Sequence, residues 1–66
     1  MTAQDLVVID AMRRFGGDFA RTLAELATRA DMENLQLIKA TWPTYWANYA
    51  DLAERDAARK AQRGQQ

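Results

Sequence analysis

The 66-residue sequence contains no cysteine, no histidine and no serine. Without cysteine, neither disulfides nor thiolate-bound zinc can staple the fold, so packing alone has to hold it together. Without all three residue types, nucleophile-and-imidazole catalysis and ordinary nitrogen- or sulfur-ligated metal sites cannot be assembled. These absences exclude most enzyme classes, and we expect a protein that is not an enzyme and that uses no cofactor or metal.

A dominant charge is also lacking, because nine Lys and Arg balance nine Asp and Glu. This balance argues against a protein that coats nucleic acid or an anionic membrane. No signal peptide or membrane span is recognisable, so we expect a cytoplasmic protein. A folded chain of this size buries only about 60% of the surface that its unfolded chain exposes, and dimerisation is one way to supplement its modest stability.

Apolar residues recur every three or four positions along almost the whole chain, which predicts helices. The first helix is expected to begin after a Thr2 cap and to end at Gly16-Gly17, where glycine reaches the left-handed conformation that closes helices. Asp18 and Asp31 are expected to cap the second and third helices, and Pro43 to begin the fourth. The side chains expected in the core are Leu6, Val8, Ile9, Met12 and Phe15; Phe19, Leu23, Leu26 and Ala30; Leu35 and Ile38 with Met32 or Leu37; and Trp42, Tyr45 or Trp46, Tyr49, and Leu52 or Ala53.

The sequence thus predicts an all-α fold, a compact bundle of three short helices and one longer carboxy-terminal helix. Acid-to-base pairs four residues apart support the fourth helix to about Lys60. Residues 1–60 are expected to form a single helical domain. Residues 61–66 are expected to be a flexible polar tail, because they have no apolar anchor.

Both tryptophans and both tyrosines lie close together, at Trp42, Tyr45, Trp46 and Tyr49. Their helical spacing favours a role in the core. The same residue types also dominate protein interfaces, because their large rings carry a polar atom at the edge. One helix face cannot bury all four rings, so we expect Tyr45 to stay exposed and to be the best candidate for a partner contact, with the other three beside it.

A second hypothesis is DNA recognition by a helix-turn-helix within residues 26–40. Ala27 would lie in the first helix, the turn would fall near Asp31, and Leu37 would pack back on the first helix. The reading side chains would be Glu33, Asn34, Gln36 and Lys39, and the phosphate clamp would be Arg55, Arg59, Lys60 and Arg63. The lack of glycine in the turn, a partly exposed Ile38 and the single base on the reading helix count against it.

Three motifs occur together within residues 5–54. They are I-D-A-M followed by F-G-G-x-F at residues 9–12 and 15–19, A-D-x-x-N-L at residues 30–35, and K-A-x-W-P-x-Y-W at residues 39–46. In this combination the chain resembles small proteins encoded by tailed phages and prophages. The resemblance implies provenance rather than an activity, and it carries over no binding residues. It also implies docking on a host or phage protein, which is how small phage proteins often act.

The sequence therefore favours a non-enzymatic, phage-type accessory protein that binds a host or phage protein in the cytoplasm of a bacterial host, with a homodimer as its expected assembly. Two alternatives stay open. One is a small helix-turn-helix-like DNA-binding regulator, and the other is a structural subunit that assembles with itself through its aromatic face.

Overall fold

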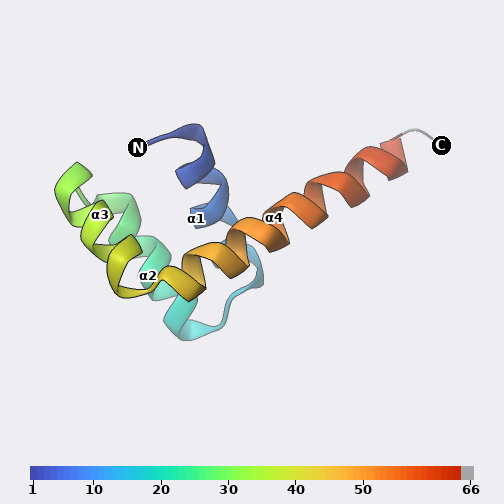
Figure 1. The fold of residues 1–66 in the computed structure, drawn as a ribbon. Coiled ribbons are helices and arrows are strands. Elements are labelled where there is room, and N and C mark those ends of the chain that lie inside the picture. The colour runs from blue at the N-terminus through green and yellow to red at the C-terminus, as the bar shows by residue number, and fades with distance from the viewer. Residues whose placement is uncertain (65–66) are drawn as a thin grey trace.

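The computed structural model describes the backbone of residues 1–64 and the side chains of residues 1–62. Within this part of the chain, helix α1 spans Ala3–Phe15, α2 spans Asp18–Arg29, α3 spans Met32–Thr41 and α4 spans Pro43–Gly64. Figure 1 shows that α4 begins beside α3 and runs across α1, and that its carboxy-terminal half extends beyond the other helices. The predicted all-α bundle of three short helices and one longer carboxy-terminal helix is confirmed.

Side-chain caps fix the starts of two helices. The Thr2 hydroxyl accepts the Asp5 N–H at 3.1 Å, and the Asp5 carboxylate accepts the Thr2 N–H at 3.2 Å, which makes a capping box at the start of α1. Asp31 caps α3 by accepting a first-turn N–H at 2.8 Å. Both predicted caps are confirmed. Asp18, by contrast, is the first residue of α2, and Gly17 occupies the cap position without a side-chain hydrogen bond.

The turn between α1 and α2 falls at Gly16 and Gly17 as predicted, but its physical reason differs. Their φ angles are −85° and −81°, so the predicted left-handed conformation is wrong. A Cβ at position 16 would overlap the Cβ of Ala20 and would lie 2.5 Å from the Met12 carbonyl oxygen and 3.1 Å from the Tyr49 hydroxyl. Gly16 is therefore required by close packing, whereas a Cβ at Gly17 would meet nothing within 4 Å.

The core lies where α1 packs against α2 and α4, with α3 closing one side. Its buried apolar side chains are Val8, Ile9, Ala11 and Met12 from α1; Ala20, Leu23, Ala24 and Ala27 from α2; Leu35 and Ile38 from α3; and Trp46 from α4. Trp42, Tyr49 and Ala50 pack against this core while partly exposed. Helix α2 thus faces the core mainly with alanines, whose small side chains let two helices approach closely.

Several large apolar side chains predicted in the core lie instead on the surface. They are Leu6, Phe15, Phe19, Leu26, Met32 and Leu37, and each is at least 41% exposed. In α2 the alanine side turns toward α1, which turns Phe19 and Leu26 outward. Helix α3 buries only Leu35 and Ile38 in the core, and both Met32 and Leu37 stay exposed.

Helix α4 begins at Pro43 as predicted and continues to Gly64, four residues past the expected end near Lys60. None of the side chains of residues 57–62 is buried. The remainder of the predicted tail, residues 65–66, lies outside the described residues.

We expect Gly16→Ala to lower the free energy of unfolding by about 1–3 kcal/mol, because the added methyl group forces the turn away from Ala20. Gly17→Ala is the matched control and should change it by less than about 0.5 kcal/mol, because its methyl group meets no other atom. Urea denaturation followed by circular dichroism measures both. Equal effects of the two substitutions would contradict the close packing at Gly16.

Candidate protein-binding surface

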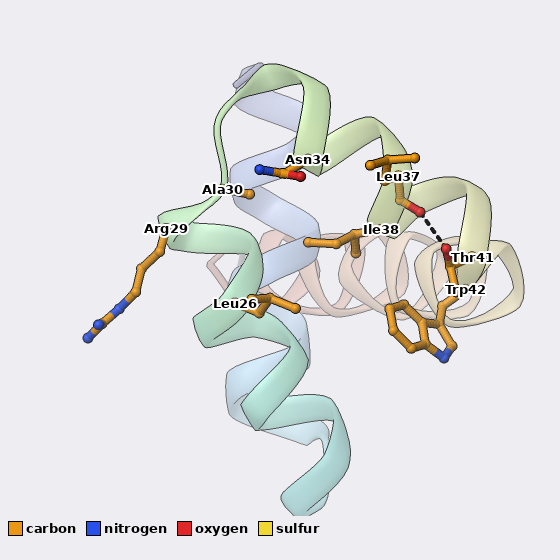
Figure 2. Close-up of a pocket in the computed structure, with 8 residues that line it drawn as sticks. All are labelled: Leu26, Arg29, Ala30, Asn34, Leu37, Ile38, Thr41 and Trp42. Carbon is orange, nitrogen blue, oxygen red and sulfur yellow. Dashed lines mark hydrogen bonds between the residues drawn. The ribbon is translucent and has the colours of Figure 1, made fainter.

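An open groove lies between α2 and α3, with Trp42 at its edge (Figure 2). Its lining residues are Leu26, Arg29, Ala30, Asn34, Leu37, Ile38, Thr41 and Trp42. Figure 2 shows Leu26, Ile38 and Trp42 directed toward the same space, whereas the Arg29 side chain extends away from it. Leu26 and Leu37 are 53% and 58% exposed, so the groove presents apolar carbon to solvent.

Local structure positions the walls of the groove. Ala30 is the carboxy-terminal cap of α2 and Asp31 is the amino-terminal cap of α3, so the two helices are joined by a very short connection. Ile38 is 6% exposed and forms the floor. The Thr41 hydroxyl donates a hydrogen bond to the Leu37 carbonyl oxygen at 2.7 Å, which satisfies this polar group within α3.

A row of aromatic rings continues this apolar surface along α2 and α4. The ring of Phe19 contacts Trp42 edge-on with centroids 6.0 Å apart and lies 5.3 Å from Tyr45, which stacks on Tyr49 at 6.4 Å. A second hollow joins the row to the groove, and its lining residues are Phe19, Thr22, Leu23, Leu26 and Trp42. We define the groove face as the five apolar side chains that these features present to solvent: Phe19, Leu26, Leu37, Trp42 and Tyr45.

The four aromatic residues singled out in the sequence have different environments. Trp46 belongs to the core at 9% exposure, and Trp42 and Tyr49 are half-buried. Tyr45 is 37% exposed, which confirms the expectation that it is the most exposed of the four. Trp42 and Tyr45 therefore contribute directly to the groove face, whereas Trp46 belongs to the core.

Sequence reasoning missed Phe19 and Leu26 as surface residues because it assigned them to the core. A signal was present, since α2 carries a second stripe of apolar residues with the same helical spacing, Ala20, Ala24 and Ala27. Either stripe leaves the charged residues of α2 in solvent. Only the structure shows that the alanine stripe is the one that faces α1.

The residues of the helix-turn-helix hypothesis are placed differently from the expectation. Leu37, expected to pack on the first helix, is exposed, and Ile38, expected to be partly exposed, is buried. Three of the four proposed reading side chains are exposed on α3: Glu33, Asn34 and Gln36. The fourth, Lys39, is half-buried and donates to Asp5 at 3.1 Å.

The proposed phosphate clamp is paired within the chain. Arg55 binds Asp51 at 3.2 Å, as expected for residues four apart. Arg59 and Lys60 bind Asp56 at 2.7 and 3.2 Å. The side chain of Arg63 lies outside the described residues. A phosphate would therefore have to compete with a carboxylate for each described member of the clamp.

The other basic side chains in the described part of the chain are paired too. Every described Lys and Arg side chain lies within 3.9 Å of a carboxylate. Among the described carboxylates, those outside these ion pairs are Asp31, Glu33 and Glu54. Asp31 and Glu33 lie at the start of α3, next to the groove residues Ala30 and Asn34. The uncompensated charge beside the groove is therefore negative.

Two buried carboxylates connect α1 to α3 and to α4. Asp5 is 4% exposed and accepts from Lys39 of α3, and Asp56 of α4 is 6% exposed and accepts from Arg14 at 3.1 Å. Burial raises the pKa of Asp5, but the hydrogen bonds from Lys39 and Thr2 outweigh it, so that the pKa lies below its ordinary value.

The environment of Asp56 shifts its pKa further. The hydrogen bond from Arg59 is the largest cause, and those from Lys60 and Arg14 add to it against the opposing effect of burial. Together they lower the pKa of Asp56 to about 2. This carboxylate is thus ionised at all but strongly acidic pH.

Two further features bear on what the surface can do. Among the described residues, no three His, Cys, Asp or Glu side chains are grouped so that they could hold a metal ion. None of the helices in this part of the chain combines the length and the apolar character that crossing a membrane requires.

Fold and surface together define a small all-α protein with an apolar groove open to solvent. No protein-family model matches the chain, and no curated protein or solved structure matches it either. The resemblance to small phage proteins therefore stays a prediction.

We expect acid to destabilise the protein through Asp56. Its pKa is about 2 in the folded chain against an ordinary value of 3.8, so its contribution to stability is complete above about pH 4 and is lost as the pH falls toward 2. The Tm difference between wild type and Asp56→Asn should be large at about pH 6 and small at about pH 2.5. Asp51→Asn, which removes an exposed pair on the same helix, should stay near wild type at both. An Asp56→Asn difference that is the same at both pH values would contradict this assignment.

Proposed function

We propose that this chain is a non-enzymatic, phage-type accessory protein that acts by binding a host or phage protein through the groove face. The observation that carries the proposal is the exposure of Phe19, Leu26 and Leu37, each more than half open to solvent. They lie along two hollows that share Leu26 and Trp42. Contiguous exposed apolar surface of this kind marks interaction sites in proteins.

Exposure of the groove face has an energetic cost. Leaving large apolar side chains in solvent gives up stabilisation that a 66-residue chain would gain by burying them. Binding of a partner to the groove face recovers part of it.

Trp42 and Tyr45 are suited to anchor such a partner. Contacts with Phe19 and Tyr49 hold their rings in place, so that little conformational freedom is lost on binding. Both side chains combine a large apolar area with a polar edge, the combination found at the centres of many interfaces.

The predicted resemblance to proteins of tailed phages and prophages agrees with this proposal, since small phage proteins often act by docking on other proteins. The ion pairs favour a protein over DNA as the partner, because each described cation would have to leave a carboxylate to bind a phosphate. A bacterial cytoplasm as the location belongs to the same proposal. Homodimerisation is not required by the groove face and stays a prediction.

The proposal is tested by affinity capture from bacterial lysate, with and without nuclease, using tagged wild type and three variants. Leu26→Asp places a charge in the middle of the groove face and should abolish capture of the partner. Tyr45→Ala removes an anchor and should weaken capture. Leu6→Asp is the matched control, because Leu6 is 56% exposed on α1, outside the groove face, and it should capture the partner as wild type does.

Circular dichroism of each variant checks that the fold is retained. A partner that survives nuclease, is lost with Leu26→Asp and is kept with Leu6→Asp is the expected result. Capture that disappears on nuclease treatment would point to nucleic acid. Equal capture by the two aspartate variants would show that the groove face is not the binding surface.

A further inference from the structure

We propose that the partner segment bound in the groove is an amphipathic α-helix that places a lysine or arginine beside the start of α3. This inference rests on the proposed function and deepens it by naming the kind of partner segment. Two separate observations support it. One is the hydrogen bonding of the backbone in the groove walls, and the other is the negative charge beside the groove.

The groove walls are helices, so most of their backbone N–H and C=O groups are hydrogen-bonded within α2 and α3 (Figure 2). The exceptions lie at the helix ends, where the last carbonyl groups of α2 have no partner within the helix. The described residues contain no strand whose edge could pair with an extended partner. The end of α2 and the Asn34 amide could pair with only a few backbone groups of an extended segment. The others would be buried without hydrogen-bond partners, which is costly. A helix satisfies these groups internally, so a helix is the segment that this groove can bury.

The length of the groove sets the size of the contact. On α3 its lining residues run from Asn34 to Thr41, which corresponds to about 10 Å along the helix axis. A partner helix covers this length in about two turns, with apolar residues at spacings of three and four. These residues would contact Leu26, Leu37 and Trp42, above the floor formed by Ile38.

Charge complementarity identifies the polar side of the partner helix. Asp31 caps α3, and Glu33 lies in its first turn, one turn before Leu37 on the same side of the helix. Neither carboxylate belongs to an ion pair among the described residues. Arg29 also lines the groove, but its side chain extends away from it toward Glu25 at 3.8 Å, a carboxylate that it shares with Arg13 at 3.9 Å. A partner therefore meets negative charge here, which a lysine or arginine complements.

The inference is tested by selection from a displayed library of helical peptides. Each peptide carries leucines at i, i+4 and i+7 and random residues at the flanking positions, and a parallel library has a proline in the middle of the same sequence. Wild type, Glu33→Lys and Glu54→Lys serve as targets. Glu54 is the matched control, because it too belongs to no ion pair but lies on α4, away from the groove.

Selection on wild type should enrich Lys and Arg at one flank at least threefold over the unselected library, and only in the proline-free library. Glu33→Lys should shift this enrichment to Asp and Glu, whereas Glu54→Lys should select as wild type does. The selected peptides should lose binding to Leu26→Asp. Fluorescence anisotropy of labelled peptides measures each of these effects.

The inference is overturned if no peptide is enriched, if Glu33→Lys selects the same charges as wild type, or if Glu54→Lys shifts them equally. It also fails if proline-containing peptides are enriched as strongly, or if binding persists with Leu26→Asp. Analytical ultracentrifugation tests whether a second copy of this chain covers the groove instead. In that case wild type would sediment as a dimer and Leu26→Asp would sediment with half its mass. The proposed function survives these outcomes as long as lysate capture depends on Leu26.

Discussion

The close packing of α2 on α1 determines which side chains this protein can bury. Helix α2 faces α1 with its alanines, Ala20, Ala24 and Ala27. Gly16 in the preceding turn has no side chain to hold Ala20 away. Because these residues are small, the helices approach closely and leave no room between them for Phe19 or Leu26. The two larger side chains point outward, and with α3 and Trp42 they form the groove face.

Two ion pairs join helices beside the apolar core. Asp5–Lys39 joins α1 to α3, and Asp56–Arg14 joins α4 to α1, across 34 and 42 residues of sequence. Loss of Lys39 would leave the buried Asp5 carboxylate without a cation, whereas Asp56 would keep Arg59 and Lys60 of its own helix. The Asp5–Lys39 pair therefore favours one arrangement of α1 and α3. The Asp5–Lys39 pair also occupies one of the side chains proposed to read DNA. The charge beside the groove is negative because Asp31 and Glu33 belong to no ion pair among the described residues.

Features that depend on neighbouring residues could be predicted from the sequence. The number of helices, the caps at Thr2 and Asp31 and the start of α4 all rest on local signals. The orientation of α2 could not, because Phe19 and Leu26 form one stripe of helical spacing and the alanines form another, and periodicity does not choose between them. The long-range ion pairs could not either, since no local pattern relates residues so far apart. One part of the candidate site, Tyr45, could be predicted. One helix face cannot bury all four aromatic rings, and Tyr45 was expected to be the exposed one.

The absence of cysteine makes the orientation of α2 directly measurable with single introduced thiols. Ala24→Cys and Leu26→Cys place a thiol on either side of the same helix, and their rates of reaction with a water-soluble thiol reagent report which side is accessible. Ala24 has 0% exposure and Leu26 has 53%. The thiol of Leu26→Cys should react nearly as fast in the native as in the denatured chain, and that of Ala24→Cys at least about tenfold more slowly. Equal rates, or a faster reaction of Ala24→Cys, would contradict the packing from which the groove face arises.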